Sequence, residues 1–333
     1  MNSLILLALA LGGACADPDS YYAGLNVSSP ETARTSLHSL IEGHTRLPYT
    51  SATQLDVWTV LEITDEDPTD ATRIIDVYRN QSLLKIDRDY QREHSWPASY
   101  GFPNDVSTNY PYTDLHHLHL ADGSYNASRG NLPFDWCASV CDERPTEVTN
   151  GIGGGTGAYP GNSNWRASDR WEVWKERRGD IARGLLYMDV RYEGGSHPVT
   201  GVAEPDLILT NERSLIVTSG GSNAAVAYMG MLSVLIEWHE LDPPDLRDQA
   251  RNEGACAAQG NRNPSSTILS LWSAFLRAAV GRRSLRQASS TTLAKNERAV
   301  VSLSRRPQLA LKVEWFHTAS SMPRPTTQRY SRL

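Results

Sequence analysis

Apolar residues recur at helical spacing in two stretches near the amino terminus, residues 32–42 and residues 50–61. In the second stretch Val57, Val60 and Leu61 fall on one face, the pattern of a helix that packs on a core. The same spacing predicts three further helices, at residues 172–192, 224–241 and 245–258. Two consecutive prolines follow the fourth of these five helices and end it, because proline cannot continue a helix.

Strand patterns are short by comparison. Residues 73–78 and 83–86 are β-branched or aliphatic runs, and the polar residues 79–81 between them suit the turn of a hairpin. Residues 146–164 are rich in Gly, Asn and Pro and predict a loop. Several helices, a few short strands and no internal repeat in 333 residues predict an α+β fold, a helix-rich single domain.

The first 16 residues have the pattern of a secretory signal peptide. Residues 4–11 form an apolar run that is too short to cross a bilayer, and Ala14 and Ala16 supply the small residues of a cleavage site before Asp17. An amino-terminal core strand is the alternative. No later segment is long and apolar enough to span a membrane. We therefore expect a secreted protein, or a periplasmic one if its source is bacterial, with no membrane partner.

Charge is distributed unevenly along the chain. The net charge is −6, but residues 264–333 carry 12 Lys and Arg against 2 Asp and Glu, which leaves residues 1–263 with a net charge of −16. An acidic body repels polyanions at long range, so binding to nucleic acid would need a metal ion or a local group of arginines. The basic, Ser-rich composition of residues 264–333 predicts a poorly ordered tail with at most one helix.

The four cysteines bear on the redox environment. Cleavage after Ala16 would remove Cys15. Cys137 and Cys141 can close a small disulfide loop in an oxidising compartment, and two neighbouring free thiols are the alternative. Cys256 would then be left without a partner.

The densest chemistry lies in residues 92–131, which hold four of the nine histidines. Hydrolysis of a phosphodiester by water needs a base with a pKa near neutral, which His94 can supply. It also needs a hard cation, and Glu93 and Asn126 offer the carboxylate and amide oxygens that such a cation binds. Adjacent strand residues point to opposite faces, so Glu93 and His94 can share one site only where the strand ends or kinks. Pro97 is consistent with such an end.

Four segments, in this order, resemble the bacterial endonuclease I family of periplasmic or secreted nucleases. They are Arg-Glu-His-Ser-Trp-Pro at 92–97; Asp-Leu-His-His-Leu with Ala-Asp-Gly and Asn-Ala-Ser-Arg-Gly-Asn at 114–131; Gly-Asp-Ile-Ala-Arg-Gly-Leu-Leu-Tyr-Met at 179–188; and Leu-Ile-Glu-Trp-His at 235–239 with Gln-Gly-Asn-Arg-Asn-Pro at 259–264. The resemblance covers roughly residues 35–264. After residue 264 the sequence departs from the family pattern, because the basic tail stands where the family has an aromatic and acidic segment.

The resemblance implies a catalytic domain over residues 17–263 that contains a His-Me (ββα-metal) finger, with the base on a strand and an Asn on the following helix. It places His94 at the general-base position and Glu93 and Asn126 at the metal-ligand positions. The metal it implies is Mg²⁺, with Ca²⁺ or Mn²⁺ as substitutes. Arg129, one helical turn after Asn126, is positioned to reach a phosphate oxygen. The implied activity is sequence-nonspecific cleavage of DNA, often also of RNA, that leaves 5′-phosphates.

Other polar residues of this stretch have plainer explanations. His116, His117 and His119 could bind zinc, but their spacing does not bring all three to one helix face and no cysteine accompanies them. We expect instead that one of them braces the finger by hydrogen bonds and that another is partly exposed. Asp114 is expected to cap a helix or to brace a His or Arg, and Asp122, which Gly123 follows, to cap a helix or to form a turn.

The leading expectation is therefore a secreted, Mg²⁺-dependent, nonspecific endonuclease that acts as a monomer on the nucleic-acid backbone. Arg92, Arg166 and Arg170 are candidates for further phosphate contacts. An extracellular ribonuclease on the same fold is one alternative, since no residue that reads a 2′-hydroxyl is identifiable. A nucleic-acid-binding protein with an inactive finger is the other. The intact base and metal-ligand set argues against it.

Overall fold

The computed structural model describes residues 15–267. Within this range seven α-helices accompany several small sheets, which confirms the α+β class. Helix α6 (Arg178–Arg191) runs through the middle of the described residues, and nearly all of its side chains are buried. One cluster of buried apolar side chains is built around α6, and a second cluster, which includes Val57, Leu118 and Ala255, contains no residue of α6.

The two helices predicted near the amino terminus begin where a side chain can cap them. Helix α3 (Pro30–Ile41) follows Ser29, whose hydroxyl caps its first turn, and agrees with the prediction to within two residues. Helix α4 (Val57–Thr64) follows Asp56, which accepts the N–H of Thr59 at 2.9 Å. The predicted start of α4 at residue 50 is wrong, because the Asp56 carboxylate satisfies the first free N–H groups seven residues later.

The helix predicted at residues 224–241 is two elements. Strand β10 (Val226–Met229) pairs in parallel with β9 (Asp206–Leu209), and α7 (Leu232–Leu241) follows and packs on α6. An apolar run does not by itself distinguish a buried strand from a buried helix. The partner strand, some 20 residues away in sequence, decides the outcome. Helix α7 ends just before the two prolines, as predicted.

The other two predicted helices need smaller corrections. The first residue of the helix predicted at 172–192 belongs to strand β8 (Trp171–Glu172), and α6 begins only at residue 178. The helix predicted at residues 245–258 is confirmed as α8 (Leu246–Gln259), capped by the carboxylate of Asp245.

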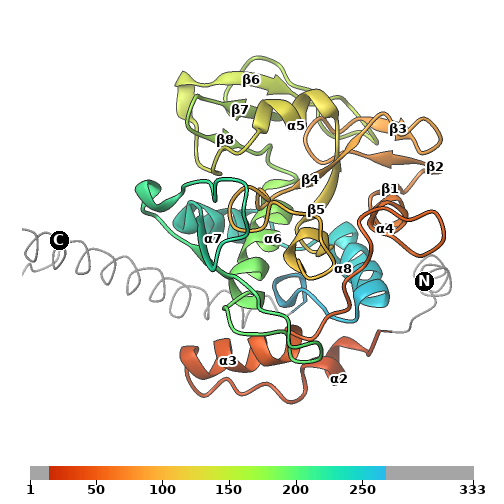
Figure 1. The fold of residues 1–333 in the computed structure, drawn as a ribbon. Coiled ribbons are helices and arrows are strands. Elements are labelled where there is room, and N and C mark those ends of the chain that lie inside the picture. Colours follow the sequence, from red (N-terminus) through yellow and green to blue (C-terminus); the bar gives the residue numbers. More distant parts are fainter. Residues whose placement is uncertain (1–14, 268–333) are drawn as a thin grey trace, which may run out of the picture. The chain divides into compact units, whose positions relative to one another are not determined.

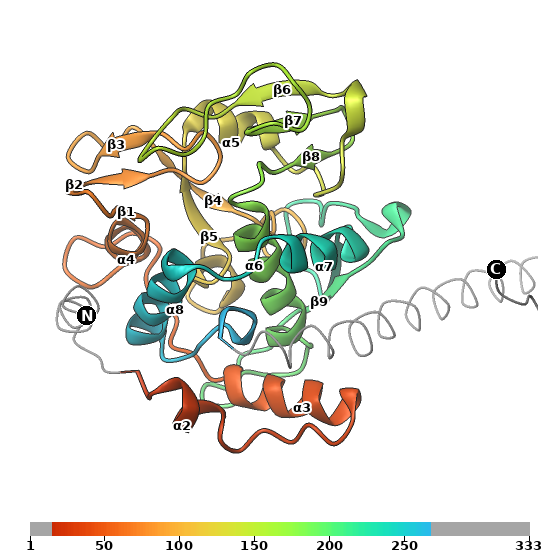
Figure 2. The same ribbon diagram turned by 180° about the vertical axis from the view of Figure 1, so that it is seen from behind.

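The predicted hairpin is confirmed, although its first strand begins three residues earlier than expected. Strand β2 (Asp70–Ile75) pairs antiparallel with β3 (Ser82–Leu84). A second sheet, whose strands come from residues 142–172, lies at the same end of the fold as this hairpin, and α3 lies at the opposite end (Figures 1 and 2). The remaining elements are α2 (Pro18–Tyr22), β1 (Glu66–Asp67) beside β2, and the antiparallel strands β6 (Asp142–Pro145), β7 (Ser163–Arg166) and β8.

The boundaries of the fold differ slightly from those predicted. Residues 264–266 form a short 3₁₀ helix, and the Ser265 side chain is fully buried, so the fold continues past residue 263. The predicted signal up to residue 14 and the tail from residue 268 lie outside the described residues. Among residues 15–267, no helix has the length and apolar composition needed to cross a membrane.

Two disulfides are present. Cys137 and Cys141 are bonded, as predicted. In the uncleaved chain Cys15 is bonded to Cys256, a pairing that the sequence did not predict. Cleavage after Ala16 remains a prediction, and it would remove this second bond.

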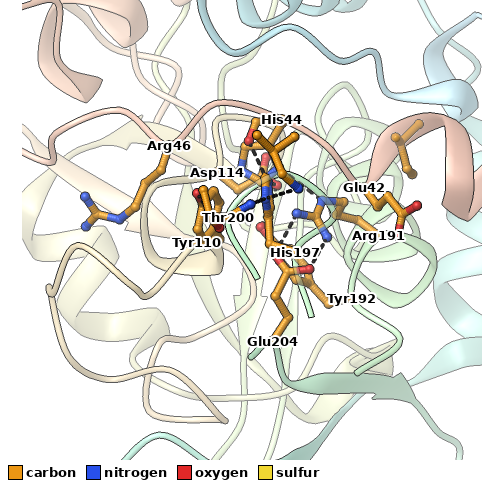
Figure 3. A network of polar contacts seen from close by, with 12 residues as sticks. Glu42, His44, Arg46, Tyr110, Asp114, Arg191, Tyr192, His197, Thr200 and Glu204 are labelled. Carbon is orange, nitrogen blue, oxygen red and sulfur yellow. Dashed lines mark hydrogen bonds and ion pairs between the residues drawn. The ribbon is translucent and has the colours of Figure 1, made fainter. Parts of the chain in front are cut away.

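A buried polar network ties the loop after α3 to the end of α6 (Figure 3). Arg191 donates to both carboxylate oxygens of Glu204, at 2.7 and 2.8 Å, and to Nδ1 of His44 at 3.0 Å. Nε2 of His197 donates to the carbonyl oxygen of His44 at 3.0 Å. Nε2 of His44 lies 3.8 Å from the Asp114 carboxylate. Asp114 begins the chain segment that enters the candidate site, so the network fixes one end of that segment.

Candidate active site

A strand–strand–helix unit carries the candidate site. Strand β4 (Gln91–His94) pairs antiparallel with β5 (Leu118–Ala121), and α5 (Gly123–Arg129) follows β5 directly. The carboxylate of Asp122 accepts N–H groups from the first turn of α5 and caps it, as predicted. The unit therefore brings β4 and α5 together although more than 25 residues separate them in sequence.

One face of β4 is covered by α5. Successive strand residues point to opposite faces, so Gln91 and Glu93 share this face. Oε1 of Gln91 accepts a hydrogen bond from Nδ2 of Asn126 at 3.0 Å. Oε1 of Glu93 lies 2.9 Å from Nη1 of Arg129. The two predicted metal ligands, Glu93 on β4 and Asn126 on α5, thus lie where these two elements pack together.

The other face of β4 is covered by aromatic rings. The guanidinium carbon of Arg92 lies 3.3 Å from the ring centroid of Tyr49 and 4.2 Å from that of Trp58. The His94 ring stacks on the same tyrosine, with 5.8 Å between centroids and 30° between ring planes. Tyr49 therefore contacts both residues of this face and fixes the predicted base beside the arginine.

Residues from both faces of β4 line one surface pocket of about 350 Å³ at the end of the strand. This is where adjacent residues of one strand can share a site, as the proline after the strand suggested. The pocket brings together all four predicted site residues, whose side chains come from β4 and α5. Its polar lining includes Gln91, Arg92, Glu93, His94, Asn126, Arg129 and Asn131.

The His94 imidazole is held in one tautomer. Its Nε2 lies 2.8 Å from the carbonyl oxygen of Tyr112. A carbonyl only accepts, so Nε2 carries the hydrogen and the lone pair of the neutral ring is on Nδ1. Burial, followed by the nearby His117 ring, lowers the pKa of His94 to about 3, below the near-neutral value expected from the sequence. The neutral ring can accept a proton through Nδ1.

Glu93 is 3 % exposed and accepts the Tyr78 hydroxyl at 2.8 Å on the same oxygen that contacts Arg129. Burial raises the pKa of Glu93, and the Arg129 charge and the Tyr78 hydrogen bond partly offset that rise. Both contacts use Oε1, so Oε2 is the oxygen that can bind a cation.

Arg129 lies beneath the site. It is fully buried, and its guanidinium donates to the carbonyl oxygens of His94, Ser95 and Gly130 at 3.1, 2.6 and 3.2 Å. With the Glu93 contact, these bonds hold the end of β4 in place. This position favours a positioning role over the direct phosphate contact expected from the sequence.

Oxygen donors for a cation come from Glu93 and Asn126. Because Asn126 directs Nδ2 to Gln91, its Oδ1 is the amide atom left to bind a cation in the pocket that Glu93 also lines. One carboxylate oxygen and one amide oxygen suit Mg²⁺, which usually keeps several of its waters. The residues present therefore fit a hydrated hard cation.

The three clustered histidines are buried and have different partners. Nε2 of His116 donates to the carbonyl oxygen of Asn261 at 3.0 Å, and Nε2 of His117 donates to that of Pro111 at 2.8 Å. His119 lies on β5, opposite the predicted carboxylate ligand on β4. Across residues 15–267, no three His, Cys, Asp or Glu side chains are grouped to hold a metal. Two of these histidines thus brace the site by hydrogen bonds, where one was expected to. The expectation that another is partly exposed is wrong, because all three side chains are buried.

Asp114 is also a brace, and most of its partners are uncharged. It accepts the hydroxyls of Tyr187 and Tyr192 at 2.9 Å each, and Nε2 of Gln259 at 3.0 Å. Burial would raise the pKa of Asp114, but neighbouring histidines, His44 first, hold that pKa below its ordinary value. The ionised carboxylate ties the segment before β5 to α6.

Of the three arginines named as further phosphate contacts, only Arg92 lines the pocket. It donates to the carbonyl oxygen of Tyr49 and to Oγ1 of Thr50, and within the described residues no carboxylate lies at ion-pair distance from it. Arg166 donates to a main-chain carbonyl at 2.7 Å, and Arg170 pairs with an adjacent aspartate at 3.0 Å. Arg92 is therefore the pocket cation that lacks a carboxylate partner.

Sequence reasoning missed several residues that support the site. Tyr49, Tyr78 and Tyr112 come from segments outside β4 and α5, and nothing in their local pattern marks them. Gln91 was detectable in principle, because it precedes Glu93 by two residues and so shares its strand face.

Comparison with known proteins places these observations in a family. The endonuclease I family model matches residues 29–267, nearly all of the described chain. An extracellular ribonuclease of Bacillus subtilis (strain 168) is 37% identical over 267 residues, covering 78% of this chain and 79% of the relative. An extracellular ribonuclease of Bacillus amyloliquefaciens is 36% identical over 255 residues, covering 75% of each chain. The matched region includes β4, β5 and α5.

Proposed function

The chain belongs to the endonuclease I family and is a nuclease that hydrolyses phosphodiester bonds, and we propose that it is a secreted, Mg²⁺-dependent, sequence-nonspecific endonuclease. The observation that carries the proposal is the meeting of Glu93, His94 and Asn126 in one pocket on a strand–strand–helix unit. A base on the first strand and an amide ligand on the helix are the arrangement expected of a His-Me finger.

His94 acts as the general base. Its Nε2–H is engaged by the Tyr112 carbonyl, so Nδ1 takes the proton from the water that attacks phosphorus in line. The ring is neutral in the free protein because burial lowers its pKa to about 3. A bound phosphate anion favours the protonated ring, which lets the base hold the proton as the reaction proceeds.

Glu93 and Asn126 would hold Mg²⁺, or Ca²⁺ or Mn²⁺ in its place, through Oε2 and Oδ1. A bound cation of this kind neutralises charge on the phosphate and on the leaving 3′ oxygen, so cleavage leaves 5′-phosphates. Arg129 keeps Glu93 and the end of β4 in position. Arg92, which has no carboxylate partner in the described part of the chain, offers its charge to the substrate backbone.

We propose both DNA and RNA as substrates, cleaved by a monomer. Contacts to phosphate carry no sequence information and do not distinguish the two sugars. Both relatives are named extracellular ribonucleases, which supports RNA as a substrate and supports secretion. Those names also make an extracellular ribonuclease that spares DNA the second candidate.

Parallel digestion of plasmid DNA and RNA, each with Mg²⁺ and with EDTA, tests the proposal. We expect both to be cleaved with Mg²⁺ only, and the new 5′ ends to accept a kinase label only after phosphatase treatment. Cleavage of RNA alone would support the second candidate. Cleavage that persists in EDTA would exclude the metal. Cleavage of neither would favour a binding protein with an inactive finger.

A further inference from the structure

The amide of Asn126 has two chemically different ends, and only one of them can bind a cation. Nδ2 donates to Oε1 of Gln91 at 3.0 Å. With Gln91 as the acceptor, rotation of the Asn126 amide alone by 180° would put an N–H where a cation needs an oxygen, and two carbonyl oxygens would then face each other. The hydrogen bond to Gln91 therefore selects the orientation in which Oδ1 faces the pocket.

The backbone places Gln91 for this task. It lies two residues before Glu93 on β4, so both side chains point to the face that α5 covers. The first residue of α5 is Gly123, where a Cβ would come within 3.2 Å of Nε2 and 3.4 Å of Cδ of Gln91. The missing side chain leaves room for Gln91 to lie against the start of α5, which restricts its rotamers. A strand glutamine that touches no neighbouring element has no such constraint.

We propose that Gln91 is a positioning residue for the metal site: it fixes the Asn126 amide so that Oδ1 is presented beside Glu93. The inference rests on the proposed metal site at Glu93 and Asn126. Groups that orient a metal ligand through a hydrogen bond typically contribute about 10–100-fold to metal affinity. Gln91 is exposed, so we expect about 10-fold, the lower end of that range.

Binding of Mn²⁺ to the full protein without nucleic acid, measured by titration calorimetry or by the loss of free Mn²⁺ signal in electron paramagnetic resonance, tests the inference. Gln91→Leu removes the acceptor and should weaken Mn²⁺ binding about 10-fold. Gln91→Glu keeps the acceptor and should bind at least as tightly as wild type. Gln54→Leu makes the same chemical change at an exposed position outside the pocket and should leave binding unchanged.

The outcomes separate this inference from the proposed site. If Asn126→Ala and Glu93→Gln leave Mn²⁺ binding at the wild-type level, the proposed metal site fails. If those variants lose binding while Gln91→Leu keeps it, the site stands and the role of Gln91 is overturned. If Gln91→Glu weakens binding as much as Gln91→Leu does, orientation by a hydrogen-bond acceptor is also overturned.

Discussion

Replacing Arg129 with methionine should lower folding stability by about 3–5 kcal/mol, the usual cost of breaking a buried ion pair from one side. The guanidinium is fully buried, 2.9 Å from Glu93, and donates to the carbonyl oxygens of His94, Ser95 and Gly130. Methionine keeps the apolar stem but leaves the carboxylate and these carbonyls without their donor. The cost therefore falls on the fold as well as on catalysis.

Urea unfolding and thermal unfolding, both followed by tryptophan fluorescence, measure this cost. In a fold of about this size each kcal/mol lowers the melting temperature by roughly 2–4 °C, so a loss of 6–20 °C is expected. Arg92→Met is the matched control, because Arg92 is on the opposite face of β4, partly exposed and without an ion pair in the described residues. Its unfolding midpoint should change far less.

A double variant sharpens the test. Adding Glu93→Gln to Arg129→Met replaces the unpaired buried carboxylate with a neutral amide, so part of the lost stability should return. If Arg129→Met unfolds at the wild-type urea concentration and only turnover falls, the positioning role is wrong and the arginine acts on the phosphate.

Three further predictions concern the base His94, the tyrosine ring that contacts it, and the buried His44 of the polar network. His94→Ala should reduce turnover about 10²–10⁴-fold with an unchanged unfolding midpoint, and near-wild-type turnover would contradict its role as base. Tyr49→Leu should reduce kcat by roughly 10-fold and should change KM much less, because the His94 ring loses its stacked neighbour. A change in KM alone would indicate that Tyr49 binds substrate instead. Stability should fall as the pH drops below about 6.5, since burial lowers the pKa of His44 to about 3 in the fold while the unfolded chain still takes up the proton. The attraction of Asp114 opposes that shift and the charge of Arg191 adds to it; the contribution of this histidine should reach about 2 kcal/mol at pH 5. A His44→Gln variant whose urea midpoint falls between pH 7 and pH 5 as much as that of the wild type would refute it.

The local parts of the fold were predictable because they depend on neighbouring residues. The hairpin of β2 and β3 and helix α8 follow from short-range patterns and caps. The helix predicted at residues 224–241 was wrong because its first half pairs with β9, a partner that no local pattern reveals. The start of α4 was misplaced because apolar spacing locates a packed face but not the cap at Asp56.

The candidate site, like the fold, was predictable only in part. The residue types and their order along the chain pointed to Glu93, His94 and Asn126, and all three lie in one pocket. Arg129 was expected at the phosphate because it lies one helical turn from Asn126. Its depth beneath β4 depends on how α5 packs, which helical spacing does not reveal.

The residue types and their order along the chain are enough to identify the available chemistry: a carboxylate, an imidazole and an amide at spacings that fit a strand followed by a helix. Which atoms of those groups are free to act depends on contacts between segments that are distant in the chain. The Tyr112 carbonyl leaves Nδ1 of His94 as the basic nitrogen, and Gln91 leaves Oδ1 of Asn126 as the donor oxygen. The physical reason is that a ring or an amide is oriented by its hydrogen-bond partners, and these partners are brought to it by packing.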